Sequence, residues 1–331
     1  MRTFTGLHAR LLDPDTLDRA ARLTVRGKRR RRDVAWFLFR REEELARLHA
    51  ALVAGTWRPE GFEVVRIRDP KPRIIARASI ADRVIHAALV DCMMPALVSS
   101  LRPECMACRP GLGTHRAALR LLEHVRRHRF FLHLDVKSYF PTVDLQILRG
   151  LLARRIRDRP FLGILDRVLD AGDGLYRSLW IRAWLKLPPH VPGKGLPVGA
   201  YTSQVLASWL YLDGLDHFVK RELKVPGYVR YVDDLLLLAD DAAQLADARQ
   251  RIGTWLFNER GLRLKWPDAS VRSCRETLVC LGHAITREGL RPLPRAKRKL
   301  RAVASNWVWT GQPDRQEMAR SLAARMGNLL P

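Results

Sequence analysis

Two adjacent aspartates, Asp233 and Asp234, interrupt an otherwise apolar run that extends from Tyr228 to Ala239. Two short runs of strand-forming residues joined by two turn-competent residues predict a tight β-hairpin. Such a hairpin holds two carboxylates at its tip, beside strands that are apolar enough to be buried. Because a buried carboxylate is costly without a positive partner, the site needs a basic side chain or a divalent metal ion.

A third carboxylate favours the metal ion. Residues 130–136 form a second apolar stretch that predicts a strand, with Asp135 near its end. If Asp135, Asp233 and Asp234 converge, they cannot all ionise without cations between them. Hard oxygen ligands select magnesium or manganese, and two such ions, roughly 3.5–4 Å apart, clamp the attacking and leaving oxygens of a phosphoryl transfer. The alternative is an ordinary Asp-Asp turn and an aspartate that only caps a strand.

The composition points to a nucleic-acid partner. The 331 residues include 59 Lys and Arg against 34 Asp and Glu, a net charge of +25, and the pI is near 11.0. Such an excess of positive charge is typical of proteins that bind nucleic acids. A membrane role is not expected, because no run of about 18 apolar residues occurs. The first residues lack the apolar segment of a signal peptide, so we expect a cytoplasmic protein.

The cysteines do not indicate a disulfide framework, because five is an odd number. Cys105 and Cys108 have a ligand-like spacing and His115 follows them, but a lone pair is a weak metal signal. We expect small buried thiols.

An α+β fold must position the acidic residues. Apolar periodicity, caps and turn residues predict its elements. The expected helices are 41–54, 79–98, 114–128 (capped by Thr114), 145–157, 161–171, 202–223 and 241–259. The expected strands are 62–68, 74–76, 130–136, 262–266 and 277–283. Residues 184–200 are expected to form a loop, 290–294 a turn at a domain boundary, and 295–301 the start of a basic helix.

Two basic features could hold phosphates. The turn after residue 68 carries Lys71 and Arg73, and an arginine there can bind a triphosphate bidentately. The run Arg29-Arg30-Arg31-Arg32 suits a phosphate-binding arm, although a solvated arm is an equal alternative. Lys71 could likewise be a solvated turn residue.

The ordered set of motifs resembles a reverse transcriptase over about residues 60–285. The matching pieces, in the order of that family, are Lys71-Pro72-Arg73, Asp135 with Tyr139-Phe140, Gly195-Leu196-Pro197-Val198-Gly199, Tyr231-Val232-Asp233-Asp234 and Leu281-Gly282. More narrowly, the segment from Val198 to Gln204 resembles the V/I-G-x-x-x-S-Q signature of reverse transcriptases from diversity-generating retroelements. Group II intron and retron enzymes usually carry Q-G-x-x-x-S-P there.

The resemblance implies a right-hand polymerase with fingers, a palm built on an antiparallel sheet with packed helices, and a small helical thumb. Fingers and palm would cover residues 1–290, and a short basic thumb residues 291–331. Asp135, Asp233 and Asp234 would be catalytic and, with the carbonyl of Val136, would bind two Mg²⁺ ions, for which Mn²⁺ could substitute.

The resemblance also implies three further groups of residues. Those at the nucleotide would be Lys71, Arg73, Tyr139, Phe140, Val198, Gly199 and Gln204, with Phe140 excluding a ribose 2′-hydroxyl. The primer grip would be Leu281, Gly282 and His283. The nucleic-acid backbone would contact Arg29, Arg30, Arg31, Arg32, Arg295, Lys297, Arg298, Lys299 and Arg301. Tyr139 and Phe140 could instead be core aromatics, and Gln204 a polar residue at a helix start. Lys194 stands where many relatives have Gln.

The implied function is RNA-directed DNA polymerisation that copies a template RNA into adenine-mutagenised cDNA during mutagenic retrohoming. The implied partners are the template RNA, the RNA/cDNA duplex, dNTPs and a basic homopentameric accessory protein. Because residues 324–328 replace a usual thumb segment, we expect the grip on the duplex to depend on such a partner. The rivals are a retron or group II intron-like reverse transcriptase, and a non-catalytic RNA-binding protein on a polymerase fold.

Overall fold

The computed structural model describes residues 3–68, 71–295, 298 and 301–302. Within this part, the chain forms two compact units, each assembled from several segments. The first unit contains the described residues up to Arg102, Lys137–Gly214 and Trp255–Arg263, and the second contains Pro103–Val136, Leu215–Thr254 and the described chain from Leu264 onward. The predicted division at residue 290, with a thumb beyond it, stays a prediction.

The first unit is mostly helical and carries one β-hairpin. Its elements are α1 (Leu7–Leu11), α2 (Pro14–Val25), α3 (Arg32–Phe39), α4 (Arg41–Val53), β1 (Phe62–Ile67), β2 (Arg73–Ala78), α5 (Ile80–Val98), α7 (Tyr139–Thr142), α8 (Leu145–Arg155), α9 (Arg159–Asp173), the 3-10 turn η1 (Leu175–Arg177), α10 (Leu179–Leu185), α11 (Tyr201–Val205) and the π-helix η2 (Leu206–Tyr211).

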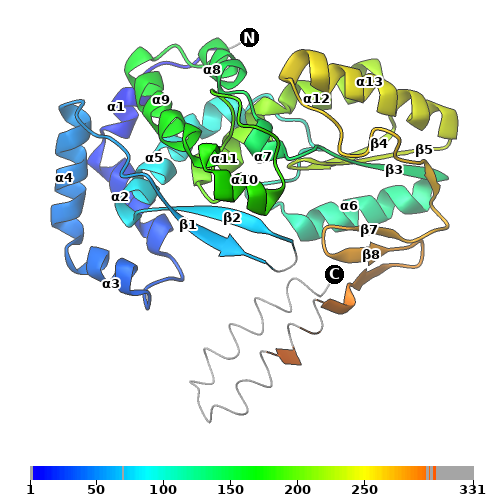
Figure 1. Ribbon diagram of the computed structural model, residues 1–331, viewed down its shortest axis with the longest axis horizontal. Coiled ribbons are helices and arrows are strands. Elements are labelled where there is room, and N and C mark those ends of the chain that lie inside the picture. The colour runs from blue at the N-terminus through cyan, green and yellow to red at the C-terminus, as the bar shows by residue number, and fades with distance from the viewer. Residues whose placement is uncertain (1–2, 69–70, 296–297, 299–300, 303–331) are drawn as a thin grey trace. The chain divides into compact units, whose positions relative to one another are not determined.

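Helix α5 forms the centre of this unit, because most of its residues from Ile80 to Leu97 are buried. Ser79 caps its start, since the Ser79 side chain accepts a hydrogen bond from the Asp82 backbone N–H. Helix α2 packs against it, and Figure 1 shows both beside the β1–β2 hairpin. The predicted helix and hairpin are therefore confirmed.

The second unit contains two antiparallel sheets. One has the strand order β4–β5–β3–β6, with β4 at Gly227–Tyr231, β5 at Asp234–Ala239, β3 at Phe130–Asp135 and β6 at Arg272–Ser273. The other has the order β7–β8–β9, with β7 at Leu278–Cys280, β8 at His283–Ile285 and β9 at Leu290–Pro292.

Helix α6 (Thr114–Arg127) lies between these two sheets (Figure 1). Its buried side chains Ala117, Leu121 and Val125 pack with Leu236 and Leu238 of β5, and the same core extends to residues of β7 and β8. The opposite face of α6 carries exposed arginines, as its sequence period predicts. This core holds β3, β4 and β5 in place and so fixes where the three aspartates lie.

The predicted helix 202–223 is broken into α and π segments. After α11 and η2, the chain continues as α12 (Asp213–His217) and a second π-helix, η3 (Phe218–Glu222). π-Helical turns are rare and often accompany functional positions. Helix α13 (Ala242–Arg260) follows β5 as predicted, since Asp241 accepts a hydrogen bond from the Ala243 N–H at its start.

Four local predictions were wrong. Thr114 is the first residue of α6 and gives no capping hydrogen bond; Gly113 precedes it. Residues 262–266 form only an isolated antiparallel bridge between Leu264 and Val136. Residues 277–283 form a hairpin rather than one strand, because the chain turns at Leu281 and Gly282. Part of the expected turn 290–294 is strand β9, which pairs with β8.

No helix among the described residues is long and apolar enough to cross a membrane. Cys92, Cys105, Cys274 and Cys280 are buried thiols, and Cys108 is half-buried.

Candidate active site

The acidic pair lies at the tip of the β4–β5 hairpin, as the sequence predicts, but the turn is shifted by one residue because Asp234 already belongs to β5. Tyr231 pairs with Asp234, which leaves Val232 and Asp233 as the two turn residues. Val232 has a φ of 59°, in the left-handed region. A β-branched residue is rare there, and such backbone strain, of about 1–3 kcal/mol, needs support from the surrounding structure.

A buried ion pair below the turn gives this support. Arg230 donates from Nε to Asp216 Oδ1 at 2.7 Å and from Nη2 to Asp216 Oδ2 at 2.6 Å, and neither side chain is exposed to solvent. Arg230 Nη1 also donates to the carbonyl of Val232 at 3.2 Å, and the Tyr228 hydroxyl donates to Asp216 at 2.8 Å. Burial opposes the charge of Arg230, but Asp216, Cys105 and Tyr228 together outweigh it and hold the pKa of Arg230 well above its usual value.

Neither Arg230 nor Asp216 was predicted as a site residue. The available signal was a single arginine inside a strand that is otherwise apolar, which predicts a buried anionic partner. The partner could not be named, because Asp216 belongs to a helix that precedes the hairpin.

The third aspartate lies directly opposite the hairpin. In the β3–β5 ladder, Asp135 and Asp234 are paired residues, and Asp233 is the next residue along the turn. Side chains of directly opposed residues lie close together on one face of a sheet. The structure therefore brings Asp135 and Asp234 together, as the strand-end position of Asp135 predicts.

Each of these two carboxylates has a cationic or polar partner. Lys265 Nζ lies 2.7 Å from Asp135 Oδ2, and His133 Nε2 lies 2.9 Å from Asp234 Oδ1. Neither Lys265 nor His133 was predicted as a site residue. His133 was detectable in principle, because residues two apart in a strand point to the same face and His133 precedes Asp135 by two.

The oxygen donors suit a hard divalent cation, but their present arrangement does not enclose one. Among the described residues, no three or more His, Cys, Asp or Glu side chains form a group that could hold a metal ion. The Lys265 ammonium stands at Asp135, so this position already holds a positive charge. On either side of Val136, the Asp135 carbonyl accepts a hydrogen bond from the Lys265 N–H, and the Lys137 N–H donates to the Arg263 carbonyl. The donor types fit the predicted Mg²⁺ ligands.

The predicted nucleotide-binding residues belong to the first unit. Arg73 begins β2, opposite Ile67, and Lys71 lies in the turn before it. The carbonyl of Val198 accepts a hydrogen bond from the Ala76 N–H at 2.7 Å, so the Val198 segment lies against the same strand. Gly199 has a φ of 115°, and a Cβ there would come within 2.8 Å of the Ala76 carbonyl oxygen. Only glycine permits this close approach.

The aromatic pair divides into a core residue and a partly exposed one. Tyr139 is buried and donates from its hydroxyl to the Ala207 carbonyl at 2.7 Å, as expected for a core aromatic. Phe140 packs edge-on against it, is half-buried, and accepts at its backbone carbonyl from the Leu196 N–H. Gln204 is exposed on α11. Phe140 and the Val198 segment thus lie in one region of this unit.

The predicted primer-grip residues lie at the β7–β8 hairpin, where Leu281 and Gly282 form the turn and His283 begins β8. Leu281 and Gly282 have φ values of 49° and 83°, as a two-residue type I′ turn requires. His283 is buried, and its Nδ1 lies 3.0 Å from the Leu281 carbonyl.

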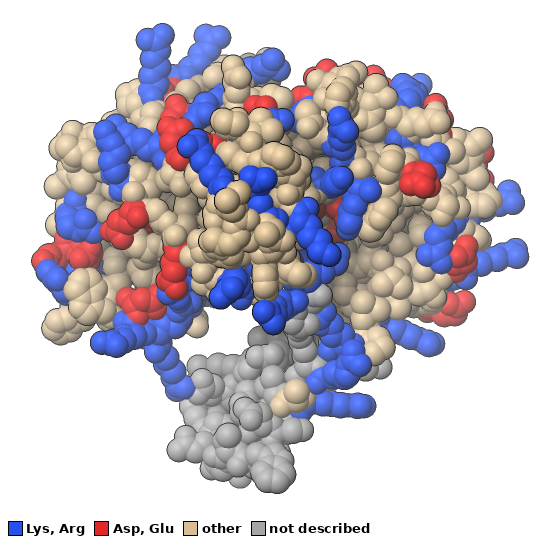
Figure 2. Space-filling model, in the orientation of Figure 1, with Lys and Arg blue, Asp and Glu red and all other residues tan. Residues whose placement is uncertain are grey.

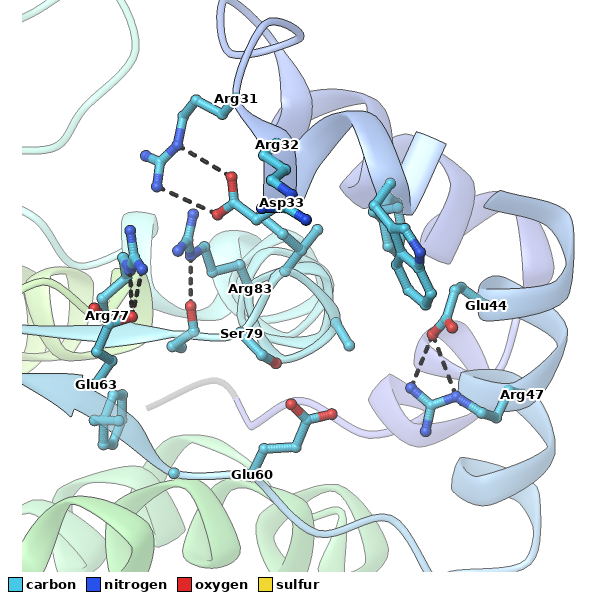
Figure 3. Close-up of a pocket in the computed structure, with 17 residues that line it drawn as sticks. Arg31, Arg32, Asp33, Glu44, Arg47, Glu60, Glu63, Arg77, Ser79 and Arg83 are labelled. Atoms are coloured by element: carbon cyan, nitrogen blue, oxygen red, sulfur yellow. Dashed lines mark hydrogen bonds and ion pairs between the residues drawn. The ribbon is translucent and has the colours of Figure 1, made fainter. Parts of the chain in front are cut away.

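A cavity of about 1280 Å³ lies in the first unit at the N-terminal basic run (Figure 3). Arg31, Arg32, Arg77 and Arg83 line it together with Asp33 and other acidic and aromatic residues. Arg31 pairs with Asp33 and Arg77 pairs with Glu63, whereas Arg83 donates to the Ala78 carbonyl at 2.8 Å. Burial, followed by the neighbouring charge of Arg31, lowers the pKa of Arg83.

The remaining predicted basic residues are only partly described. Arg29 and Arg30 are exposed in the loop between α2 and α3. Arg298 and Arg301 are exposed, Arg295 is half-buried, and Lys297 and Lys299 lie outside the described residues, as do residues 324–328. Lys and Arg outnumber acidic residues on the face seen in Figure 2.

Comparison with known proteins assigns these features to a family. Residues 67–282 match the family described as reverse transcriptase (RNA-dependent DNA polymerase). Protein YkfC of Escherichia coli is 24% identical in an alignment of 325 residues. The alignment covers 84% of this chain and 82% of YkfC. The group II intron-encoded protein LtrA of Lactococcus lactis is 24% identical over 181 residues, 54% of this chain and 28% of LtrA.

The fold is also that of a polymerase. The structure of apo telomerase from Candida tropicalis aligns with a TM-score of 0.51 at 9% identity and covers 76% of this chain and 53% of that chain. The predicted α+β right-hand polymerase fold is confirmed. The matched range contains Asp135, Asp233 and Asp234. The chain belongs to the reverse transcriptase family.

Proposed function

We propose that this protein is an RNA-directed DNA polymerase that copies a template RNA into cDNA within a diversity-generating retroelement. The observation that carries the polymerase activity is the direct pairing of Asp135 with Asp234, beside Asp233 in the turn, in a chain of the reverse transcriptase family. Proximity of carboxylates on neighbouring strands is what two-metal nucleotidyl transfer requires.

The chemistry would depend on this chain's own residues as follows. Asp135, Asp233 and Asp234, with the Val136 carbonyl, would hold two Mg²⁺ or Mn²⁺ ions. When bound, the ions would stabilise the attacking 3′-oxygen and the leaving pyrophosphate. Lys71 and Arg73 would bind the triphosphate of the incoming dNTP, and Phe140 would exclude its 2′-hydroxyl. Leu281, Gly282 and His283 would grip the primer.

The template RNA and the RNA/cDNA duplex would bind through arginines. The cavity lined by Arg31, Arg32 and Arg83 supports this, because guanidinium groups bind phosphate oxygens; Arg31 also pairs there with Asp33. Arg29, Arg30 and the basic residues from Arg295 to Arg301 would add further phosphate contacts. The protein would act with a basic homopentameric accessory protein and in the cytoplasm, where the RNA and dNTPs are available.

The retroelement type rests on the segment Val198-Gly199-Ala200-Tyr201-Thr202-Ser203-Gln204. It has Val where the group II and retron pattern has Gln, and Gln where that pattern has Pro. A group II intron-like enzyme is the second candidate, and the similarity to LtrA favours it. Sequencing of cDNA copied from a defined RNA separates the two, because only the first candidate predicts errors concentrated at template adenines.

Primer extension on an RNA template with Mg²⁺ or Mn²⁺ tests the polymerase activity. We expect the wild type to extend the primer and Asp135→Asn to lose about a thousandfold or more in rate, because a missing metal ligand removes several kcal/mol of transition-state stabilisation. Asp268→Asn is the matched control, since Asp268 is exposed in the same unit. Extension by Asp135→Asn at the control rate would refute the assignment. An inactive wild type that still binds RNA would instead favour the non-catalytic rival.

A further inference from the structure

Lys265 is bound to Asp135 at two points. The Lys265 N–H donates to the Asp135 carbonyl at 2.8 Å, and the ammonium reaches Asp135 Oδ2 at 2.7 Å. The Asp135 side chain is 18% exposed and that of Lys265 is 34% exposed. The backbone bond fixes the start of the lysine side chain, so the ion pair is part of the local fold rather than a chance surface contact.

A neighbouring ring also holds the ammonium. Lys265 Nζ lies 4.0 Å from the centre of the Trp266 ring, within the range of a cation–π interaction. Leu264, on the other side, forms the antiparallel bridge with Val136. The segment from Leu264 to Trp266 therefore presents one positive charge to the carboxylate of Asp135.

The acidic residues need such a charge. Asp135 and Asp234 are directly opposed in the β3–β5 ladder, and like charges in this position destabilise a sheet. Lys265 offsets the charge of Asp135, while His133 lies at hydrogen-bond distance from Asp234. A divalent ion bound by Asp135 would use the same carboxylate, and it would repel an ammonium held 2.7 Å from that carboxylate's oxygen.

We propose that Lys265 is a built-in counter-cation of the acidic site, which leaves Asp135 when a divalent ion binds. Lys265 then has two effects that can be separated. It stabilises the acidic site in the absence of metal, and it weakens metal binding because its ion pair with Asp135 must first be broken. This inference rests on the proposed function, because it assigns Asp135 as a metal ligand. Lys265 is a positioning residue in this scheme and takes no part in the chemistry.

Lys265→Met tests the inference, because methionine keeps an unbranched apolar side chain and removes the charge. Mn²⁺ binding to the full chain without nucleic acid can be followed by electron paramagnetic resonance of free Mn²⁺. We expect the dissociation constant to fall about fivefold, the factor that corresponds to one partly exposed ion pair. Lys137→Met is the matched control. It removes the same charge two residues from Asp135, where Lys137 is exposed, and should change the constant less than about twofold.

A second readout is the melting temperature in chelator and in saturating Mg²⁺. Lys265→Met should melt below the wild type in chelator and should gain more from Mg²⁺ than the wild type gains. Unchanged or weaker Mn²⁺ binding by Lys265→Met, or no binding by either protein, would overturn the inference.

Mn²⁺ binding by Asp135→Asn, by Lys265→Met and by the double variant that carries both substitutions distinguishes this inference from the proposed function. If Asp135→Asn weakens Mn²⁺ binding but Lys265→Met has no effect, only the role of Lys265 fails. If Asp135→Asn leaves Mn²⁺ binding unchanged, the metal site of the proposed function fails as well. If Lys265→Met tightens binding only when Asp135 is present, both are supported.

Discussion

Arg230 and Asp216 form a bidentate ion pair with no solvent exposure on either side chain. The pair joins strand β4 to the helical segment before it, and through Arg230 Nη1 it also holds the carbonyl of Val232 in the strained turn. The geometry of the Asp233 turn therefore depends on a charge pair that lies entirely inside the second unit.

Breaking this pair should be strongly destabilising. Asp216→Asn keeps the side-chain shape but leaves Arg230 buried without its counter-charge, so we expect a loss of about 3–5 kcal/mol in the free energy of unfolding. Denaturant unfolding monitored by circular dichroism measures this loss. The exposed pair Arg272–Glu276 of the same unit is the control, and Glu276→Gln should cost less than about 1 kcal/mol. Equal losses in the two variants would contradict the importance assigned to burial.

Stability should depend on pH through Asp82. Burial raises the pKa of Asp82 to about 6, although the Glu60 N–H donates to its carboxylate. The folded state therefore binds this proton more tightly than the unfolded state does, and Asp82 favours folding below about pH 4. This contribution is lost as the pH rises toward 6, and it amounts to about 3 kcal/mol at most.

Asp82→Asn should remove this dependence of the free energy of unfolding on pH. His86 and His124 act in the opposite direction, because burial lowers the pKa of each to about 4. Their contribution to the stability of the folded state rises with pH. Both histidines are present in the variant and in the wild type, so their contribution cancels when the two proteins are compared at each pH. The variant should gain stability relative to the wild type between pH 4 and pH 6 in thermal or denaturant unfolding. A difference that stays constant over this range would rule out titration of Asp82.

RNA binding should be steeply dependent on salt and should rest partly on Arg29 to Arg32, which lie in the loop between α2 and α3 and at the first residue of α3. Replacing Arg29, Arg30, Arg31 and Arg32 with Gln should lower the slope of log K against log salt by roughly 0.7–0.9 for each phosphate that these arginines neutralise. Fluorescence anisotropy with a labelled RNA at several salt concentrations measures the slope. A control with the same change of charge replaces four exposed arginines of α6, namely Arg116, Arg120, Arg126 and Arg127. If both sets lower the slope equally, the loop contributes only to overall charge.

The proposed retroelement type predicts a particular error pattern. Val198 stands where many relatives have Gln, and an aliphatic side chain there removes a polar contact that could orient the new base pair. Selection of the correct incoming nucleotide would then rest more on base pairing and less on protein contacts. We expect misincorporation biased to template adenines, and partial repair by Val198→Gln. The Val198 carbonyl bonds Ala76 through the backbone, so the substitution should leave that contact intact.

Sequencing cDNA that both proteins copy from one RNA checks this prediction. Equal error rates at all four template bases in the wild type would exclude the mutagenic function. A bias that is the same in Val198→Gln would keep the function but remove Val198 as its cause.

Local sequence features determined the hairpin that carries Asp233 and Asp234, the strand that ends at Asp135, and most helix positions. Apolar periodicity, turn residues and caps act between neighbouring residues, so the sequence contains these signals directly. It could not show that residues 277–283 turn back at Leu281, because a short apolar run fits one strand or two.

The tertiary structure alone decided which charges meet. Lys265 pairs with Asp135 across 130 residues, and Arg230 pairs with Asp216 on a separate element. The chain contains 59 basic residues, and composition and spacing cannot select two of them as partners. That choice follows from the strand order β4–β5–β3–β6 and from the helices packed on it, which bring distant segments to hydrogen-bond distance. The carboxylates were therefore predictable from the sequence, whereas the groups that neutralise them were set by the fold.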